Sequence, residues 1–294
     1  MVIIGNKSGQ LGNRLFVFAH FIANAIEFGY EVWNPSFYDY AGYFENTRHD
    51  FFCRFPARKT RIGNSSLRQT AFYNLIFYPA VLYHRSGLGN SLLRVVNIWR
   101  SHDRRAQNCD LASKEFVRLR KDSRVLIAQG WLFRDFVNVT KHAATLRQFF
   151  TPIELHRHNV ARLIDAARRD CDVLVGAHIR QGDYANLGGG KYFYDTPQYV
   201  ELLSRATDLW RGKRVKFLIC SNVPQDETLF RGLNSVRGNN HLVEDMYALA
   251  RCDYLIGPPS TFTMWASFYG AVPLFMIEML DGPINLGSFQ VHRG

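Results

Sequence analysis

The chain has few of the features that would place it among membrane-spanning or disulfide-stapled proteins. No apolar run approaches the roughly 18 uncharged residues that a membrane helix needs, and the apolar early segment Leu15–Ile26 is interrupted by His20 and Asn24. The first residues, Met-Val-Ile-Ile-Gly, lack the basic region that is typical of a signal peptide. The sequence has five cysteines, an odd number, and none of them forms a Cys-x-x-Cys motif. Their pattern therefore indicates neither a zinc site nor a disulfide framework. We therefore expect a cytoplasmic protein.

Positive charge is what the chain has in excess. Its 294 residues include 36 Lys and Arg against 25 Asp and Glu, a net charge of +11. This balance favours an anionic partner, which could be nucleic acid, a phosphorylated substrate or an acidic membrane surface. The basic segment Arg94–Arg124 could bind nucleic acid or anionic lipid. It lacks the interleaved aromatic residues of an RNA-binding module, and a solvated surface is the alternative interpretation.

The order of apolar segments predicts an α/β protein with parallel, doubly wound sheets. The chain opens with a strand at 2–4, a glycine-rich turn, and a helix that ends at Gly29, where the next strand follows at 30–33. The first half closes with a strand at 125–128 and a helix at 152–169. The second half alternates apolar strands at 173–179, 215–220, 254–256 and 272–277 with helices at 197–210, 244–251 and 261–269.

The segment from 37 to 124 is less regular, and we expect only short helices there, at 67–83 and 92–100. The most polar junction in the chain is Arg168–Asp172. We therefore expect two facing Rossmann-like domains, the first over residues 1–170 and the second over residues 171–294.

The first candidate site is the turn Gly9-Gln10-Leu11-Gly12-Asn13-Arg14, between a strand and a helix. Its glycine spacing differs from G-x-G-x-x-G, and no acidic residue ends the next strand, although an NAD-dependent enzyme stays an alternative. The turn places the backbone N–H groups, the Asn13 amide and the Arg14 guanidinium at a helix N-terminus, a position that favours anions. The alternative is a tight turn with Arg14 merely solvated.

The second candidate site follows a buried strand and reads His178-Ile179-Arg180-Gln181-Gly182-Asp183-Tyr184. Ligands of open α/β sheets bind at the carboxyl ends of the strands. Alternation along the strand sends His178 and Arg180 to one face, and Arg180 could form two charge-assisted bonds to a diphosphate. A surface ion pair between Arg180 and Asp183 is the alternative.

The third candidate site is the segment Gly257-Pro258-Pro259-Ser260-Thr261, which leads from a strand into a helix. Ser260 is a natural N-cap, and the helix N-terminus with its hydroxyls could hold a second phosphate. Simple capping is the alternative, and Asp245 could likewise only cap its own helix. The pair Asp170-Cys171-Asp172 precedes its strand, at the wrong end of the sheet for a metal-binding Asp-x-Asp. We therefore expect no metal.

These motifs, in this order, resemble the fucosyltransferase superfamily, most closely the bacterial α-1,2-fucosyltransferase-like proteins (glycosyltransferase family eleven). The resemblance is carried by the segments that start at Gly9, His178 and Ser260, and by three more: Gly189-Gly190-Lys191-Tyr192-Phe193-Tyr194, Ile219-Cys220-Ser221-Asn222 and Glu244-Asp245-Met246. It departs from the superfamily at Gln181, where a second Arg is usual, and at Met264-Trp265, where a Trp pair is usual.

The resemblance implies a GT-B fold, GDP-fucose as the donor, no metal and inversion at the anomeric carbon. Arg180 would bind the β-phosphate, and Ser260 and Thr261 the diphosphate. The guanosine would contact His178 and Asp245, and the nucleotide site would also include Gly12, Ser221 and Asn222. Asn13 and Arg14 would face the reacting sugar.

Charge development in the reaction assigns the remaining roles. Arg180 and the helix that begins after Ser260 stand where negative charge grows on the departing GDP. Asp183 is the one carboxylate within its motif, and it is the candidate base for the acceptor hydroxyl; the alternative is that it only orients Arg180. The expected acceptor is a glycan or lipid-linked glycan of a surface polysaccharide, reached from the cytoplasmic side with peripheral contact to an anionic membrane.

Overall fold

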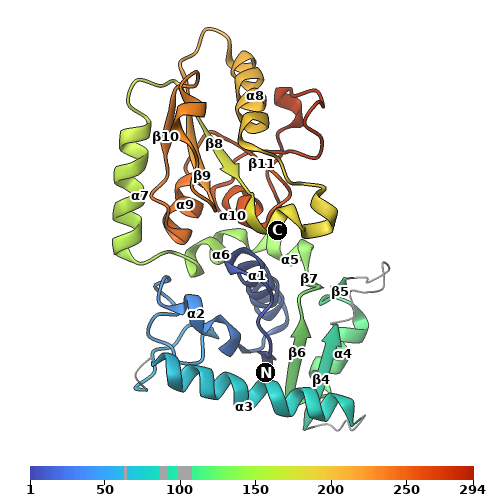
Figure 1. Ribbon diagram of the computed structural model, residues 1–294. Coiled ribbons are helices and arrows are strands. Elements are labelled where there is room, and N and C mark those ends of the chain that lie inside the picture. Colours follow the sequence, from blue (N-terminus) through green and yellow to red (C-terminus); the bar gives the residue numbers. More distant parts are fainter. Residues whose placement is uncertain (63–64, 87–91, 99–107) are drawn as a thin grey trace. The chain divides into compact units, whose positions relative to one another are not determined.

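The computed structural model describes residues 1–62, 65–86, 92–98 and 108–294 (Figure 1). The chain divides into two compact units, Met1–Ile153 and Glu154–Arg293. The break precedes helix α7 (Glu154–Ala167), whereas the sequence placed it after residue 170. The reason is packing, because α7 lies against α9 (Leu242–Leu249) of the second unit. The apolar face predicted for α7 is buried there, through Val160, Leu163, Ile164 and Ala167.

The first unit is built on a five-stranded sheet with the order β3-β2-β1-β6-β4. All pairs are parallel except β2 with β3. The strands are β1 (Val2–Ile4), β2 (Val32–Trp33), β3 (Arg54–Phe55), β4 (Leu93–Ile98) and β6 (Val125–Gly130). A small second sheet pairs β5 (Cys109–Asp110) with β7 (Phe133–Arg134).

Two long helices flank this sheet. Helix α1 (Leu11–Phe28) is buried along most of its length and ends at Gly29, which has φ 66° as its C-cap. Helix α3 (Ser66–Arg85) packs Ala80 and Ile76 against Ile3 and Ile127 of the sheet. The shorter helices of this unit are η1 (Pro35–Phe37), α2 (Tyr38–Ala41), α4 (Lys114–Lys121), α5 (Phe136–Lys141) and α6 (Ala143–Phe149).

The helix expected at 92–100 is wrong, because residues 93–98 form strand β4. Leu93 and Val95 pack against the cluster of Ile3, Ala80 and Ile127, which is the every-second-residue spacing of a strand. Residues 99 and 100 of that expected helix lie outside the described residues, as do Arg104 and Arg105 of the basic segment.

The second unit contains a fully parallel five-stranded sheet with the order β10-β9-β8-β11-β12. Its strands are β8 (Val173–Ile179), β9 (Val215–Ser221), β10 (Ser235–Arg237), β11 (Tyr254–Gly257) and β12 (Leu274–Met276). Its other helices are α8 (Thr196–Thr207) and α10 (Thr261–Gly270), with short 3₁₀ turns η2 (Gly182–Ala185), η3 (Leu187–Gly190), η4 (Asp208–Trp210), η5 (Glu227–Phe230) and η6 (Leu286–Ser288).

The parallel α/β architecture predicted from the alternating segments is confirmed in both units. In the second unit the continuous apolar strand β8 lies in the middle of the sheet and is buried from Leu174 to Ile179. Within the described residues, no helix has the length and apolar character needed to span a membrane. All five cysteines are free thiols.

Candidate functional site

The predicted motifs of the second unit meet at the carboxyl edge of its sheet. Strands β8 and β11 are neighbours with Ala177 opposite Ile256, so the segments that follow them start side by side. Gly257 allows this close approach: a Cβ there would lie 3.1 Å from Thr263 Oγ1 and 3.2 Å from His178 Cβ. The two segments that carry Arg180 and Ser260 are therefore brought together as the sequence predicted.

His178 is held inside the unit. Its Nδ1 lies within hydrogen-bonding distance of Thr263 Oγ1, at 2.6 Å, and its ring stacks on Phe262 with 4.7 Å between centroids. Burial, together with the nearby Arg180 charge, lowers the pKa of His178 to about 3. The imidazole is therefore neutral at physiological pH.

Arg180 and Asp183 form the ion pair that the sequence left as an alternative. The Arg180 Nη2 donates to Asp183 Oδ2 at 2.8 Å, and the guanidinium lies over the Tyr184 ring at 5.4 Å. The Arg180 side chain is only 14% exposed, whereas that of Asp183 is 54% exposed. Tyr184 in turn donates its hydroxyl to the carbonyl of Pro259, 2.6 Å away. A largely buried cation is thus fixed next to the segment that leads into α10.

Ser260 caps α10 as predicted. Its Oγ accepts a hydrogen bond from the Phe262 N–H at 3.3 Å, and Thr261 is the first residue of the helix. Capping and phosphate binding are compatible, since other N–H groups of the first turn stay available to an anion. Ser260 itself is buried.

Gln181, Ser221 and Asn222 serve a structural network at this edge. Asn222 Oδ1 accepts from the Gln181 backbone N–H at 2.8 Å. Gln225 Nε2 donates to both Gln181 Oε1 and Ser221 Oγ, at 2.9 and 3.1 Å. The Gln181 amide also donates to the carbonyl of Tyr194. These bonds tie β8 to β9 and to the segment before α8, and they give Gln181 a role that an Arg would not fill.

Asp245 is a buried carboxyl near the ends of β9 and β10. It is 5% exposed, and its backbone carbonyl lies 4.0 Å from Cys220 Sγ. Burial raises the pKa of Asp245 to about 6, against the opposing effect of the backbone N–H groups of Asn239, Asn240 and His241. Within the described residues, Asp245 Oδ1 has no hydrogen-bond partner. The helix cap is His241, whose Nδ1 accepts from the Val243 and Glu244 N–H groups, so Asp245 is not a cap.

The glycine-rich turn of the first unit holds Arg14 in place. Gly9 has φ 60°, and a Cβ there would lie 2.1 Å from Asn13 Nδ2. Arg14 donates from Nε to the Gly9 carbonyl at 3.1 Å and from Nη1 to the Ser36 carbonyl at 3.0 Å. Its side chain is 10% exposed, so the interpretation of Arg14 as merely solvated is wrong.

Asp39 and Lys7 complete this cluster, and the sequence analysis missed both. Asp39 Oδ2 accepts from Arg14 Nη1 at 2.7 Å and lies 2.9 Å from Lys7 Nζ. Burial opposes ionisation of Asp39, but the bonds from Lys7 and Arg14 outweigh it and lower the pKa of this carboxyl. Lys7 also donates to the Tyr38 hydroxyl at 2.7 Å. The signal that could have found Lys7 is its position inside the turn, two residues after Gly5.

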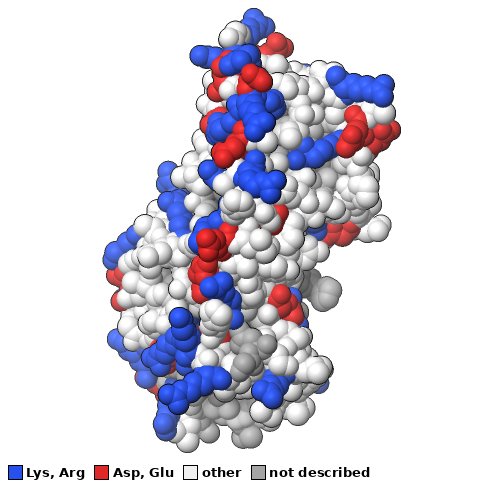
Figure 2. All heavy atoms as spheres, turned by 90° about the vertical axis from the view of Figure 1, so that its left-hand side faces the viewer, with Lys and Arg blue, Asp and Glu red and all other residues white. Residues whose placement is uncertain are grey.

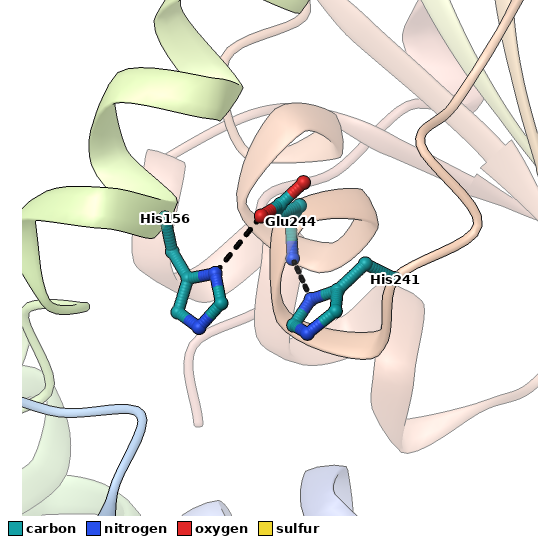
Figure 3. A group of neighbouring side chains, drawn as sticks. All are labelled: His156, His241 and Glu244. Atoms are coloured by element: carbon teal, nitrogen blue, oxygen red, sulfur yellow. Dashed lines mark hydrogen bonds and ion pairs between the residues drawn. The ribbon is translucent and has the colours of Figure 1, made fainter.

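A third cluster joins His156 of α7 to the start of α9 (Figure 3). His156 Nδ1 lies 2.9 Å from Glu244 Oε1, and its ring stacks on His241 at 4.6 Å. Asn159 and Asn239 donate to Glu244 at 2.7 Å each. Among the described residues, His156, His241 and Glu244 are the group whose atoms lie close enough together for a metal. However, both Glu244 oxygens and the His241 Nδ1 are engaged in hydrogen bonds, so the cluster is explained as a link between α7 and α9.

An open cavity of about 920 Å³ lies beside β12 in the second unit. Its lining includes Met276, Glu278, Met279, Gln290 and Val291. None of the predicted site residues lines it, so the predicted site is a different place.

Comparison with known proteins gives the fold. No family model matches the chain, and no curated protein matches it either. Among solved structures it is similar to a variant of Arabidopsis thaliana FUT1 in complex with GDP, with a TM-score of 0.58, 15% identity, and coverage of 98% of this chain and 73% of that one. NodZ α-1,6-fucosyltransferase soaked with GDP-fucose gives a TM-score of 0.55 at 15% identity over 98% and 96% of the two chains.

The fucosyltransferase NodZ from Bradyrhizobium gives a TM-score of 0.53 at 17% identity, over 94% of this chain and 95% of that one. At these identities the similarity concerns the fold. The chain therefore has the fold of these proteins, the GT-B type built from two Rossmann-like units.

Proposed function

We propose that the protein is a metal-independent, inverting fucosyltransferase that moves fucose from GDP-fucose to a hydroxyl of a glycan acceptor. The observation that carries this proposal is the placement of Arg180, a largely buried guanidinium fixed by Asp183 next to the start of α10. The support from known proteins is that structures of this fold include complexes with GDP and a crystal soaked with GDP-fucose.

The chemistry needs such a cation. As the bond between fucose and GDP breaks, the sugar gains oxocarbenium character and the diphosphate gains negative charge. Without a divalent cation, protein groups have to balance that charge. Arg180 and the N–H groups at the start of α10 are preorganised for this, and one such donor is worth about 3–4 kcal/mol in the transition state.

The guanosine contacts follow from two ionisation states. His178 is neutral, so it offers one donor and one acceptor rather than a second positive charge. The Asp245 carboxyl, with a pKa of about 6, is mostly ionised at neutral pH. A buried carboxylate is suited to accept N–H groups of a guanine edge, and we assign Asp245 to the base. Gly12, Ser221, Asn222 and Thr261 stay predicted parts of the nucleotide site.

Asp183 is our candidate base for the acceptor hydroxyl, because its carboxylate is half exposed while one oxygen is bonded to Arg180. Asn13 and Arg14 are proposed to act on the reacting sugar. The acceptor we propose is a glycan or lipid-linked glycan of a surface polysaccharide, handled in the cytoplasm.

The test compares Arg180→Ala with Arg214→Ala. Arg214 makes an equivalent ion pair, with Asp172 at 2.9 Å, but it precedes β9 at the amino edge of the same sheet. We expect Arg180→Ala to lower the rate of fucose transfer from GDP-fucose by about 100- to 1,000-fold and to weaken GDP binding, while Arg214→Ala retains both. Near-normal turnover of Arg180→Ala would reject the phosphate role.

Two further measurements test the donor and the metal. Thermal-shift titrations with GDP, UDP, CDP and NAD should show stabilisation by GDP, and a preference for NAD would favour the oxidoreductase alternative. Transfer should persist in EDTA. Loss of activity that manganese restores would overturn the metal-independent assignment.

A further inference from the structure

Helix α3 is apolar on two opposite faces, and only one of them is used inside the first unit. The inner face packs Ile76 and Ala80 against the sheet, and the Tyr73 hydroxyl accepts a hydrogen bond from the Lys7 backbone N–H at 3.2 Å. Tyr83 donates to the Leu93 carbonyl of β4 at 3.1 Å. These contacts account for the attachment of the helix to its unit.

The outer face of α3 is a stripe of large apolar side chains in solvent. Leu67, Leu75, Tyr78 and Leu82 are 83%, 70%, 60% and 65% exposed. With Ala71 between them, they recur every three or four residues, so they lie along one side of the helix. A continuous exposed apolar stripe on a folded protein marks an interaction surface. We call these five residues the α3 stripe.

The part of the sequence that contains α3 is strongly basic. From residue 51 to residue 102 the sequence contains eight Lys and Arg and no Asp or Glu. Arg68 and Arg85 are exposed in the first and last turns of α3 itself. The asymmetry extends to the whole unit: residues 1–153 carry 21 Lys and Arg against 10 Asp and Glu, whereas residues 154–294 carry 15 of each. On the face drawn in Figure 2, the first unit, in the lower part of the view, shows more blue than red.

We propose that the α3 stripe docks on an anionic lipid bilayer. Its leucines and Tyr78 would enter the boundary between headgroups and acyl chains, while Arg68 and Arg85 contact lipid phosphates. Helices that lie in the membrane interface combine these two features, an apolar face and flanking basic residues. Each basic residue near such a surface adds about 1 kcal/mol of attraction, which corresponds to a roughly fivefold increase in the binding constant.

Two other occupants fit the surface less well. A second copy of this chain would bring the same excess of positive charge against the stripe, and the two would repel each other. RNA is held by phosphate contacts and by bases stacked on aromatic or Arg side chains; Arg68, Arg85 and Tyr78 could take part in such contacts, but the three leucines would stay exposed to water. An anionic lipid surface would bury the leucines and attract the positively charged side chains.

The experiment uses the full chain and sedimentation with vesicles. One set contains phosphatidylcholine alone. The other contains phosphatidylcholine with about 30% phosphatidylglycerol, an anionic lipid that gives the vesicles a negative surface potential. The wild type should bind the anionic vesicles and not the neutral ones. The double variant Leu75→Ser/Leu82→Ser should bind at least tenfold more weakly, and Arg68→Gln/Arg85→Gln should also lose binding.

The matched control is Leu155→Ser, an equally exposed leucine (61%) on α7 of the second unit, which should bind like the wild type. Because all of these side chains are exposed, the variants should keep the wild-type circular dichroism spectrum. Tyr78→Ser removes a different apolar side chain of the α3 stripe, and it should also weaken binding to the anionic vesicles. Transfer to a soluble acceptor should not change in any of them, so failure here is separate from failure of the proposed function.

Three results would overturn the proposal. The first is binding of Leu75→Ser/Leu82→Ser to anionic vesicles with wild-type strength, or no binding of the wild type at all. The second is a dimer in sedimentation equilibrium that the same double variant converts to monomer, because a second copy then covers the stripe. The third is tight binding of a 20-nucleotide RNA that the leucine variant abolishes.

Discussion

Replacing Asp245 with Asn separates what this carboxyl costs the fold from what it gives the nucleotide. Burial raises its pKa to about 6, because ionising a carboxyl away from water is unfavourable. The backbone N–H groups of Asn239, Asn240 and His241 offset only part of that cost. An Asn side chain keeps an oxygen to accept from these groups and carries no charge.

The magnitude follows from the difference between the two pKa values. A carboxyl with a pKa of about 6 in the folded state and 3.8 in the unfolded chain destabilises the fold by at most about 3 kcal/mol at neutral pH. Below the unfolded value, both states are protonated and the cost vanishes. As the pH rises from there through 6, the unfolded chain ionises first, so stability is lost until the cost reaches its plateau.

The assay is urea unfolding of wild type and Asp245→Asn at intervals from pH 4 to pH 8, with Asp165→Asn, an exposed carboxyl on α7, as the control. The stabilisation by Asp245→Asn should be small at pH 4, which is just above the unfolded pKa of 3.8, then grow with pH and level off above pH 7. GDP affinity at pH 7.5 should fall about ten- to a hundredfold, since a charged hydrogen-bond acceptor is worth about 1.5–3 kcal/mol.

Two outcomes would refute this reasoning. If Asp245→Asn destabilises the protein at pH 7.5, or changes its stability equally at every pH, the buried carboxylate is not a cost to the fold. If the variant is stabilised and still binds GDP with wild-type affinity, the assignment of Asp245 to the guanine is wrong while the electrostatic argument stands.

Three further perturbations test the packing around the candidate site. Asp39→Asn releases Lys7 and Arg14, so fucose transfer should slow at least tenfold, while GDP affinity should fall much less because most of the proposed nucleotide contacts, Arg180 and Asp245 among them, lie in the second unit; equal loss of both in kinetics and titration would contradict this. Glu244→Gln leaves one acceptor oxygen for three donors and should lower the free energy of unfolding by about 1–3 kcal/mol in urea, unlike the exposed control Glu201→Gln. Gly176→Ala places a Cβ 2.6 Å from Leu249 Cδ2 and should cost about 1–3 kcal/mol by the same assay, whereas Gly232→Ala, with open space around it, should be neutral.

The sequence predicts the second unit better than the first because of how strands are buried there. A strand covered on both faces, such as β8, must be apolar throughout, and that run is visible without any partner. Strand β4 contains Arg94 among its apolar residues and alternates between faces, so its pattern over a few residues was mistaken for a helix. The short strands β3 and β10 contain no apolar run long enough to indicate a strand from the sequence.

The contacts of the candidate site also fall into those that the sequence can predict and those that depend on the fold. Arg180 and Asp183 are three residues apart, so their ion pair is a local property that sequence can propose. Asp39 reaches Arg14 across 25 positions, and only the fold of the first unit brings them together. Gln181 shows a third case: where the resemblance implies an Arg, this chain has an amide that accepts from Gln225 and donates to the Tyr194 carbonyl, and only the fold brings these partners to it.

The two units differ in how their charges can act on a ligand. Residues 154–294 have no net charge, so a nucleotide diphosphate cannot be attracted there by a general positive field and has to be bound by individually placed groups such as Arg180. Residues 1–153 hold the whole excess of +11. Most of the Lys and Arg side chains that the structure describes there are exposed, and such a field acts over about 8 Å at physiological salt. Added salt should therefore weaken membrane attachment steeply and GDP binding only slightly, because a partly buried cation is screened much less. If both proposals hold, the net charge of the first unit attracts the protein to a membrane, and oriented single groups such as Arg180 bind the nucleotide.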